Sequence, residues 1–318
     1  MGRLVDGVWK TDAELAAQAE LTSNTGAFQR AESQFRRWVT ADGSSQFAPE
    51  PGRYHLYVSF ACPWAHRALI FRKIKGLESI VSFSPTDAVA TDNGWSFGKE
   101  SEFTKDPLFG FDYLHQVYTK ADPRYNGRVT VPVLFDKHTN TIVSNESAEI
   151  IRMLNSEFKD FADPESPDYY PESLRPKIDE INPFVYDNIN NGVYKCGFAK
   201  LQEPYAEAFA NLFSALDHVE ALLSSQPYLA GDQLTEADWR LFTTLLRFDA
   251  VYVGLFKCNK KRIADYPNLT RFLKLLYNFP GVKSTVNFDH IKRHYYMTMR
   301  NLNPSGIVPI GPELDLEA

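Results

Sequence analysis

The feature that most constrains the fold is a single cysteine, Cys62, which stands between a strand pattern and a helical pattern. The aromatic and apolar run from Tyr54 to Phe60 is typical of a short buried strand. Apolar residues then recur at helical spacings from Ala65 to Gly76, and Pro63 suits a first helical position, where its missing N–H costs nothing. A second apolar run, Ile80 to Phe83, completes a strand–helix–strand unit. The sequence therefore predicts a mixed α/β domain built around Cys62.

A second set of patterns extends this domain. We expect a helix near Tyr113 to Lys120, followed by a strand from Val129 to Leu134 that Pro132 interrupts. A cis peptide bond at Pro132 is one way to expose the preceding backbone. Thr141 to Ser144 completes a hairpin, and Ser144 and Asn145 are predicted to cap a helix that starts at Glu146. Strand–helix–strand followed by strand–strand–helix is the order of the thioredoxin fold.

The remaining regions show different patterns. Residues 1–50 read as an N-terminal extension with one amphipathic helix near Ala27 to Val39, where Phe28, Phe35 and Trp38 fall at helical spacings. A linker rich in Pro, Asp and Ser spans 163–171, and only helical periodicity follows it. We therefore predict a thioredoxin-like α/β domain over 51–162 and an all-helical domain over 172–318. The clearest helix start is Thr235 to Asp238, which reads as a capping box.

Composition excludes several classes of function. The 318 residues carry a formal net charge of −6, which argues against nucleic-acid binding, and the short basic cluster from Lys257 to Arg262 reads as a solvated loop. The sequence contains no apolar run of about eighteen residues, the length that a membrane helix needs. Met1 to Asp6 carries no signal-peptide pattern. Three cysteines cannot close a disulfide framework, and no C-x-x-C pair predicts a metal site. We expect a cytoplasmic protein.

The position of Cys62 predicts a reactive thiolate. Unpaired amides and the positive end of the helix dipole favour the thiolate at a helix N-terminus. The residue three positions later is Ala65, so no resolving cysteine is present and an external thiol must resolve any mixed disulfide. Glutathione is the abundant cytosolic candidate. Cys196 and Cys258 are interpreted as small buried hydrophobes.

Three residues fit a peptide-like ligand such as glutathione. The backbone of Val131, next to Pro132, is placed to offer hydrogen bonds, and Glu146 and Ser147 at a helix start can hold a carboxylate and an amine.

Several further motifs resemble one family, the glutathionyl-hydroquinone reductases, which are the Xi-class glutathione transferases and are related to the Omega class. The similarity covers nearly the whole chain, although the stretch between Trp95 and Phe111 is shorter than in the family. It rests on Ser59 to Arg67, Asn93 to Trp95, Val129 to Val133, Ser144 to Glu149, Asn190 to Tyr194, Arg247 to Asp249, Val251 and Tyr252, Asn287 to Ile291, and His294 and Tyr295.

The resemblance implies a role for each matching residue. Cys62 matches the nucleophile, and Tyr194 matches the proton donor. Tyr194, Tyr252 and Tyr295 match three tyrosines that line the electrophile pocket. The positions that match the glutathione-binding residues are Trp95, Arg128, Val129, Thr130, Val131, Glu146 and Ser147. The resemblance also implies a homodimer, with glutathione as co-substrate, an aromatic glutathionyl-hydroquinone as substrate, and no metal.

Two other functions stay open at this point. One is an Omega-like thioltransferase or dehydroascorbate reductase that uses the same cysteine on other substrates. The other is a non-catalytic module that keeps the fold to bind ligands or partners. Such a module has no need of a reactive thiol, so the intact Cys62 segment favours an enzyme.

Overall fold

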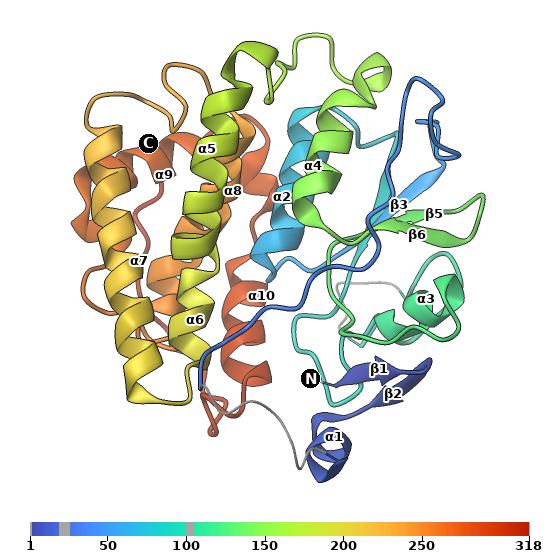
Figure 1. Ribbon diagram of the computed structural model, residues 1–318, viewed down its shortest axis with the longest axis horizontal. Coiled ribbons are helices and arrows are strands. Elements are labelled where there is room, and N and C mark those ends of the chain that lie inside the picture. The colour runs from blue at the N-terminus through green and yellow to red at the C-terminus, as the bar shows by residue number, and fades with distance from the viewer. Residues whose placement is uncertain (1, 19–25, 100–104, 318) are drawn as a thin grey trace. The chain divides into compact units, whose positions relative to one another are not determined.

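The computed structural model describes residues 2–18, 26–99 and 105–317 (Figure 1). The chain forms two compact units, and neither is a continuous stretch of sequence. The first unit consists of Met1–Thr22, Glu32–Ser166 and Asn287–Thr298. The second consists of Ser23–Ala31, Pro167–Val286 and Met299–Ala318. Each unit therefore combines one long segment with shorter segments from elsewhere in the chain.

The first unit is built on a four-stranded sheet in the order β4-β3-β5-β6. The central strand β3 pairs in parallel with β4 and antiparallel with β5, and β5 pairs antiparallel with β6. All five residues of β3 are buried, because helices cover both faces of the sheet. The strands are β3 (Tyr54–Val58), β4 (Ser82–Pro85), β5 (Val133–Asp136) and β6 (Thr141–Ser144).

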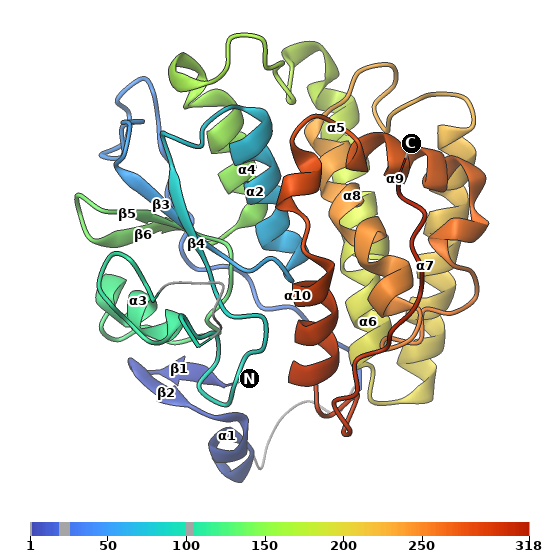
Figure 2. The ribbon, with the colours of Figure 1, turned by 180° about the vertical axis from the view of Figure 1, so that it is seen from behind.

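Helices α2 and α4 lie side by side on one face of this sheet, and α3 lies on the other face (Figures 1 and 2). The unit also holds a small N-terminal hairpin, β1–β2, and the late helix α10 with its π-helical extension η7. The bounds are β1 (Arg3–Val5), β2 (Val8–Lys10), α1 (Asp12–Gln18), α2 (Pro63–Ile74), α3 (Leu114–Ala121), α4 (Ser147–Ser156), η1 (Lys159–Phe161), α10 (Phe288–Arg293) and η7 (His294–Thr298).

The thioredoxin-like order predicted for this unit is confirmed, with local corrections. The second strand starts at Ser82, two residues later than predicted, and β5 starts only after Pro132, whose peptide bond with Val131 is cis. The predicted cap of α4 is wrong, because the helix starts at Ser147 and Glu146 itself is the N-cap.

Hydrogen bonds explain why the predicted cap residues do not serve α4. The hydroxyl of Ser144 accepts the Glu146 N–H, and Asn145 bonds to the hydroxyl of Tyr118 and the backbone of Phe35. Asn145 is therefore engaged outside the helix, and Ser144 bonds to the N–H of the N-cap residue and to the carboxylate of Glu149 rather than to a backbone N–H of α4.

The helix predicted over residues 27–39 is also wrong. Residues 35–37 instead run extended beside β6: the Arg37 N–H donates to the carbonyl of Val143 at 2.9 Å, and the Asn145 N–H donates to the carbonyl of Phe35 at 3.1 Å. Phe35 stacks against Tyr125 with ring centroids 5.4 Å apart. The backbone of this segment is thus satisfied by a sheet edge rather than by helical bonds.

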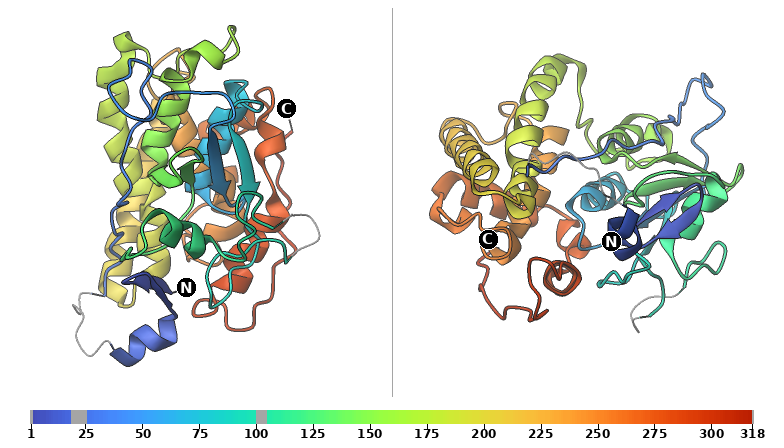
Figure 3. Two further views of the ribbon diagram at one scale, coloured as in Figure 1. Left: turned by 90° about the vertical axis from the view of Figure 1, so that its right-hand side faces the viewer. Right: turned by 60° about the horizontal axis from the view of Figure 1, so that its bottom comes forward.

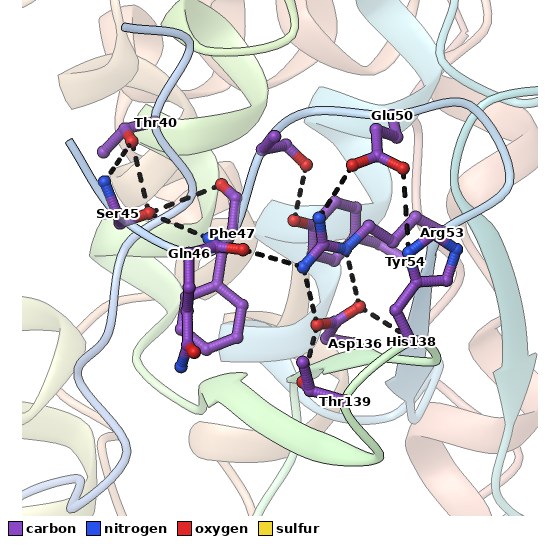
Figure 4. Close-up of polar contacts among 11 residues, drawn as sticks. Thr40, Ser45, Gln46, Phe47, Glu50, Arg53, Tyr54, Asp136, His138 and Thr139 are labelled. Atoms are coloured by element: carbon purple, nitrogen blue, oxygen red, sulfur yellow. Dashed lines mark hydrogen bonds and ion pairs between the residues drawn. The ribbon is translucent and has the colours of Figure 1, made fainter. Parts of the chain in front are cut away.

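A buried ion pair ties the segment before β3 to the end of β5 (Figure 4). The guanidinium of Arg53 donates to both carboxylate oxygens of Asp136, at 2.8 and 2.9 Å, and also to Glu50 and to the carbonyl of Gln46. Burial of Asp136 opposes its ionisation, but the hydrogen bonds from Arg53, Thr139 and the backbone outweigh that cost and lower the pKa of the carboxyl.

In its described residues, the helices and strands assigned to the second unit are all helices (Figure 3). Among the residues that the structure describes, π-helical turns extend α5 and α8 of this unit and α10 of the first unit. The elements of the second unit are η2 (Glu172–Leu174), α5 (Arg175–Val185), η3 (Tyr186–Asn190), α6 (Gly192–Phe198), α7 (Gln202–Leu223), α8 (Glu236–Arg247), η4 (Phe248–Tyr252), η5 (Ile263–Asp265), α9 (Pro267–Tyr277) and η6 (Val282–Thr285). The predicted fold class, a thioredoxin-like domain followed by a helical domain, is confirmed.

The predicted capping box at the start of α8 is present. The carboxylate of Asp238 accepts the backbone N–H and the hydroxyl of Thr235, and its other oxygen accepts the N–H of Leu229 at 2.7 Å. Asp238 is fully buried, and this burial raises the pKa of its carboxyl to about 6.

Candidate active site

Cys62 stands at the N-cap of α2, as predicted. Its backbone is extended, with φ −79° and ψ 123°, its carbonyl accepts the N–H of His66 at 3.0 Å, and Pro63 follows as the first helical residue. The N–H of Cys62 donates to the carbonyl of Ser59, which closes a tight turn between β3 and α2. Cys62 is only partly buried, and it sits at the N-terminal, positive end of a twelve-residue helix.

Val131 lies beside this sulfur. The Cys62 Sγ is 3.6 Å from the carbonyl oxygen of Val131, the residue that precedes the cis peptide bond. Along the extended segment, Val129 and Val131 are buried, whereas Arg128 and Thr130 are exposed. The structure therefore brings one predicted glutathione-binding residue into direct contact with the predicted nucleophile.

The start of α4 carries two more predicted residues. Glu146 accepts the N–H of Ala148 and the hydroxyl of Ser33, each at 3.1 Å, so its carboxylate is fixed at the helix end. Ser147 is buried, and its hydroxyl accepts a hydrogen bond from the guanidinium of Arg67 at 3.4 Å. Arg67 belongs to α2, so this bond connects the helix of Cys62 with the helix of Ser147.

Trp95 is buried and stacks on His294. The two ring centroids are 4.6 Å apart with an interplanar angle of 11°. A ring nitrogen of His294 also lies 2.9 Å from the carbonyl of Ala88, and Tyr295 packs edge-on against the same imidazole at 5.5 Å. The segment Asn287–Thr298 thus brings Tyr295 into the unit that carries Cys62 and places His294 against Trp95.

Two tyrosines of the proposed electrophile pocket meet in the second unit. Tyr194 on α6 and Tyr252 on η4 have ring centroids 6.1 Å apart. Phe256 packs on both rings, at 5.4 Å from Tyr194 and 5.2 Å from Tyr252. Both tyrosines are largely buried, with exposed fractions of 8% and 0%. The aromatic cluster also includes Phe28 and Phe198.

Sequence reasoning gave no role to Arg67, His294 or Arg30, all of which touch predicted site residues. Their partners lie far away in sequence or on other elements, and no local pattern marks such contacts. His294 was visible only as a neighbour of Tyr295 in a family-like motif.

The other two cysteines are buried, as predicted. Cys196 is 2% exposed and Cys258 is fully buried. Burial, together with a hydrogen bond between the two side chains, raises the pKa of the Cys258 thiol, which disfavours its thiolate. Both sulfur-bearing residues are therefore shielded from solvent, whereas Cys62 is only partly buried.

Neither a metal-binding cluster nor a membrane-spanning helix is found in the described residues. Within 2–18, 26–99 and 105–317, no group of three or more His, Cys, Asp or Glu side chains is arranged to hold a metal ion. In the same ranges, none of the helices combines the length and apolar character that a membrane crossing requires. Residues 100–104, part of the stretch between Trp95 and Phe111 that the family resemblance predicts to be shorter, lie outside the described residues.

Two family models match this chain, one in each unit. The glutathione S-transferase N-terminal domain matches residues 61–157, and the C-terminal domain matches residues 202–275. The first match begins one residue before Cys62 and covers β5, β6 and α4.

Comparison with characterised proteins gives close relatives along the full chain. Glutathionyl-hydroquinone reductase YqjG of Escherichia coli strain K12 is 52% identical, over 100% of this chain and 97% of the relative. Glutathionyl-hydroquinone reductase PcpF of Sphingobium chlorophenolicum is also 52% identical, over 98% of this chain and 96% of the relative.

Two solved structures are also similar to this chain along its full length. The glutathione-bound structure of YqjG superposes with a TM-score of 0.89 at 50% identity, covering 100% of this chain and 97% of that one. A Xi-class glutathione transferase from Natrialba magadii superposes with a TM-score of 0.92 at 48% identity, covering 100% and 95% of the two chains. By its sequence, its two matched domains and its fold, the chain belongs to the glutathionyl-hydroquinone reductases, the Xi class of the glutathione transferases.

Proposed function

We propose that this protein is a glutathione-dependent reductase that cleaves glutathionyl-hydroquinones to hydroquinone and glutathione disulfide. The observation that carries the proposal is the placement of Cys62 at the N-cap of α2, partly exposed, with Ala65 where a resolving cysteine would stand. A helix N-terminus favours the thiolate, and a lone thiolate needs an external thiol to complete a cycle. The reductase names of YqjG and PcpF support the same choice of substrate.

The first half of the proposed reaction forms a mixed disulfide. The Cys62 thiolate attacks the glutathione sulfur of the thioether, a sulfur–sulfur bond forms, and the carbon–sulfur bond breaks. The electron pair of the broken bond stays on the hydroquinone ring, which takes up the hydroxyl proton of Tyr194. Tyr194 then regains a proton from solvent.

The second half regenerates the enzyme. The thiolate of a second glutathione attacks the Cys62–glutathione disulfide, which releases glutathione disulfide and the Cys62 thiolate. The hydroquinone carbon is reduced and two glutathione sulfurs are oxidised, so electrons balance without a metal or a further reductant.

Glutathione is proposed to bind in the first unit. We assign to it the residues around Cys62, because Val131 contacts the sulfur and Glu146 and Ser147 stand at a helix start that favours an anion. Two solved relatives, YqjG and the Xi glutathione transferase ECM4 from Saccharomyces cerevisiae, are structures in complex with glutathione. The full proposed set is Trp95, Arg128, Val129, Thr130, Val131, Glu146 and Ser147.

The aromatic substrate is proposed to meet Tyr194, Tyr252 and Tyr295. Phenol hydroxyls can donate hydrogen bonds to a thiolate and to oxygens of the departing hydroquinone, and bonds to charged acceptors are the stronger kind. We further propose that residues 51–162 and 172–318 divide these tasks as glutathione-binding and electrophile-binding domains, and that the enzyme works in the cytoplasm as a homodimer. Light scattering on the purified protein measures the oligomeric state.

Intact-mass spectrometry after mixing with oxidised glutathione tests the nucleophile. We expect the wild type and a Cys196→Ala control to gain one glutathionyl group, and Cys62→Ala to gain none. An adduct that persists in Cys62→Ala would place the chemistry on another residue and overturn the mechanism.

Turnover assays test the substrate class. We expect a glutathionyl-hydroquinone to be turned over much faster than dehydroascorbate. The reverse preference would instead identify an Omega-like reductase that uses the same cysteine.

A further inference from the structure

Residues 26–30 run along α6, and three of them contact this helix or the chain just after it. The carbonyl of Gly26 accepts the N–H of Lys200, just beyond the C-terminal end of α6, at 2.9 Å. Phe28 stacks on Phe198 with ring centroids 5.5 Å apart. Arg30 reaches the N-terminal end of the helix. Phe28 and Arg30 therefore both direct their side chains towards α6, whereas Gly26 contacts the chain just after the helix through its backbone carbonyl.

Arg30 places its guanidinium over the ring of Tyr194. The Arg30 Cζ is 4.7 Å from the centroid of the Tyr194 ring and 5.4 Å from that of Phe28. Its Nε donates a hydrogen bond of 2.9 Å to the Oδ1 of Asn191, which is 7% exposed and immediately precedes α6. The guanidinium is therefore held by a hydrogen bond while it rests on the phenol ring.

A cation in this position acts on the ring it covers. A guanidinium is attracted to the electron-rich face of an aromatic ring, and Arg makes this contact more often than Lys. A phenolate carries far more negative charge than a phenol, so a nearby cation stabilises the phenolate more. Release of the hydroxyl proton is therefore favoured, which is what a general acid needs.

We propose that Arg30 is a positioning residue for Tyr194, which holds the phenol ring in place and favours transfer of its hydroxyl proton to the departing hydroquinone. This inference rests on the proposed function, because it assigns Arg30 to the proton-transfer step of that reaction. It extends the site to the N-terminal segment, which neither matched domain includes.

Two substitutions separate charge from hydrogen bonding at position 30. Arg30→Gln keeps a donor for Asn191 but removes the cation. Arg30→Lys keeps the cation but loses the planar fork. Arg37→Gln is a matched control, because the Arg37 guanidinium also lies over aromatic rings, at 5.9 Å from Phe35 and 5.5 Å from Phe47, but in the first unit.

The measured quantity is the single-turnover rate at which Cys62 becomes glutathionylated, with a glutathionyl-hydroquinone or with oxidised glutathione. With the hydroquinone thioether we expect Arg30→Gln to slow the step about fivefold, the upper end for a cation–π contact made by an exposed arginine, and Arg30→Lys to recover most of the rate. With oxidised glutathione the leaving group is a thiolate that needs no proton, so we expect Arg30→Gln and Arg37→Gln to stay within about twofold of the wild type.

The same substitution in a Tyr194→Phe background decides whether Arg30 acts through Tyr194. We expect Arg30→Gln to cause no further loss there, since the proton it assists is already absent. Three results would overturn the inference: an unchanged hydroquinone-thioether rate in Arg30→Gln, an equal loss with oxidised glutathione, or a full additional loss in the Tyr194→Phe background. Failure of the proposed function looks different, because the wild type itself would then form no adduct at Cys62.

Discussion

The imidazole of His55 shows how one buried side chain makes stability depend on pH. Its two ring nitrogens each lie 2.8 Å from a serine hydroxyl of the neighbouring strand, one from Ser82 and one from Ser84. Burial, with smaller contributions from the positive charges of Lys137 and Arg72, lowers the pKa of His55 to about 3. The folded protein therefore keeps this ring neutral where an unfolded chain would protonate it.

We expect this histidine to make the fold sensitive to mild acid. The unfolded state takes up the proton below its ordinary pKa of about 6.5, so the contribution of His55 is complete above that pH and is lost as pH falls towards about 3. At pH 5 the loss is about 2 kcal/mol in the free energy of unfolding. Urea titrations of wild type and His55→Gln at pH 7.5 and pH 5 measure it. A wild type that loses no more stability than the variant between these values would contradict the assignment.

The site residues differ in how well the sequence reveals them. Cys62 and Pro63 can be recognised from the local sequence, because a strand pattern, a cysteine and a proline at a helix start are neighbours in the chain. Arg67 and His294 could not be found in this way. Each acts through a contact with another element, Ser147 in one case and Trp95 in the other, and only the tertiary fold creates these pairs.

At the scale of elements, the errors in prediction share one physical cause. Helical spacing of aromatic residues predicts a helix over 27–39, but the backbone of residues 35–37 bonds to β6 and to Asn145 instead. Phe28 and Phe35 pack on different units, so their spacing reflects two separate contacts. The strands and helices around Cys62 were predictable because their partners are adjacent in sequence. The path of the N-terminal extension was not, because distant segments determine it.

The strand β5 depends on the buried pair of Arg53 and Asp136 at its end. Their side chains are 6% and 0% exposed, and without the Asp136 charge the buried guanidinium keeps Glu50, which is 45% exposed, as its ion-pair partner. We expect Asp136→Asn to reduce the free energy of unfolding by about 3 kcal/mol, measured by urea denaturation.

An exposed ion pair provides the control for this substitution. Lys105 and Asp112 are 3.2 Å apart and more than half exposed, so we expect Asp112→Asn to change stability by no more than about 0.5 kcal/mol. Equal effects of the two substitutions would mean that burial does not set the strength of the Arg53 pair.

At the scale of the whole molecule, each compact unit is assembled from distant parts of the chain. Asn287–Thr298 belongs to the first unit, although the helices of the second unit precede it in sequence. Through this segment His294 supports Trp95, and Tyr295 joins the unit of Cys62. The fold class was predictable from the order of elements, but this interleaving was not, because no pattern in α10 indicates which unit it joins.

We expect His294→Ala to loosen the region around Trp95 without affecting the second unit. Loss of the stacked ring and of the contact with the carbonyl of Ala88 should speed amide hydrogen exchange in residues 88–97 by about tenfold, while α7 keeps its protection. His218→Ala is the matched control, because His218 packs edge-on against Phe184 within the second unit. Faster exchange in residues 88–97 of His218→Ala, or unchanged exchange there in His294→Ala, would contradict this view.

The interleaved chain also limits how such proteins can recombine. A single crossover near residue 166, between two homologous genes, would combine Trp95 from one parent with His294 from the other, and Arg30 from one with Tyr194 from the other. A hybrid that keeps each unit intact must take residues 23–31 from the parent that supplies the C-terminal half. It must also take residues 287–298 from the parent that supplies the N-terminal half.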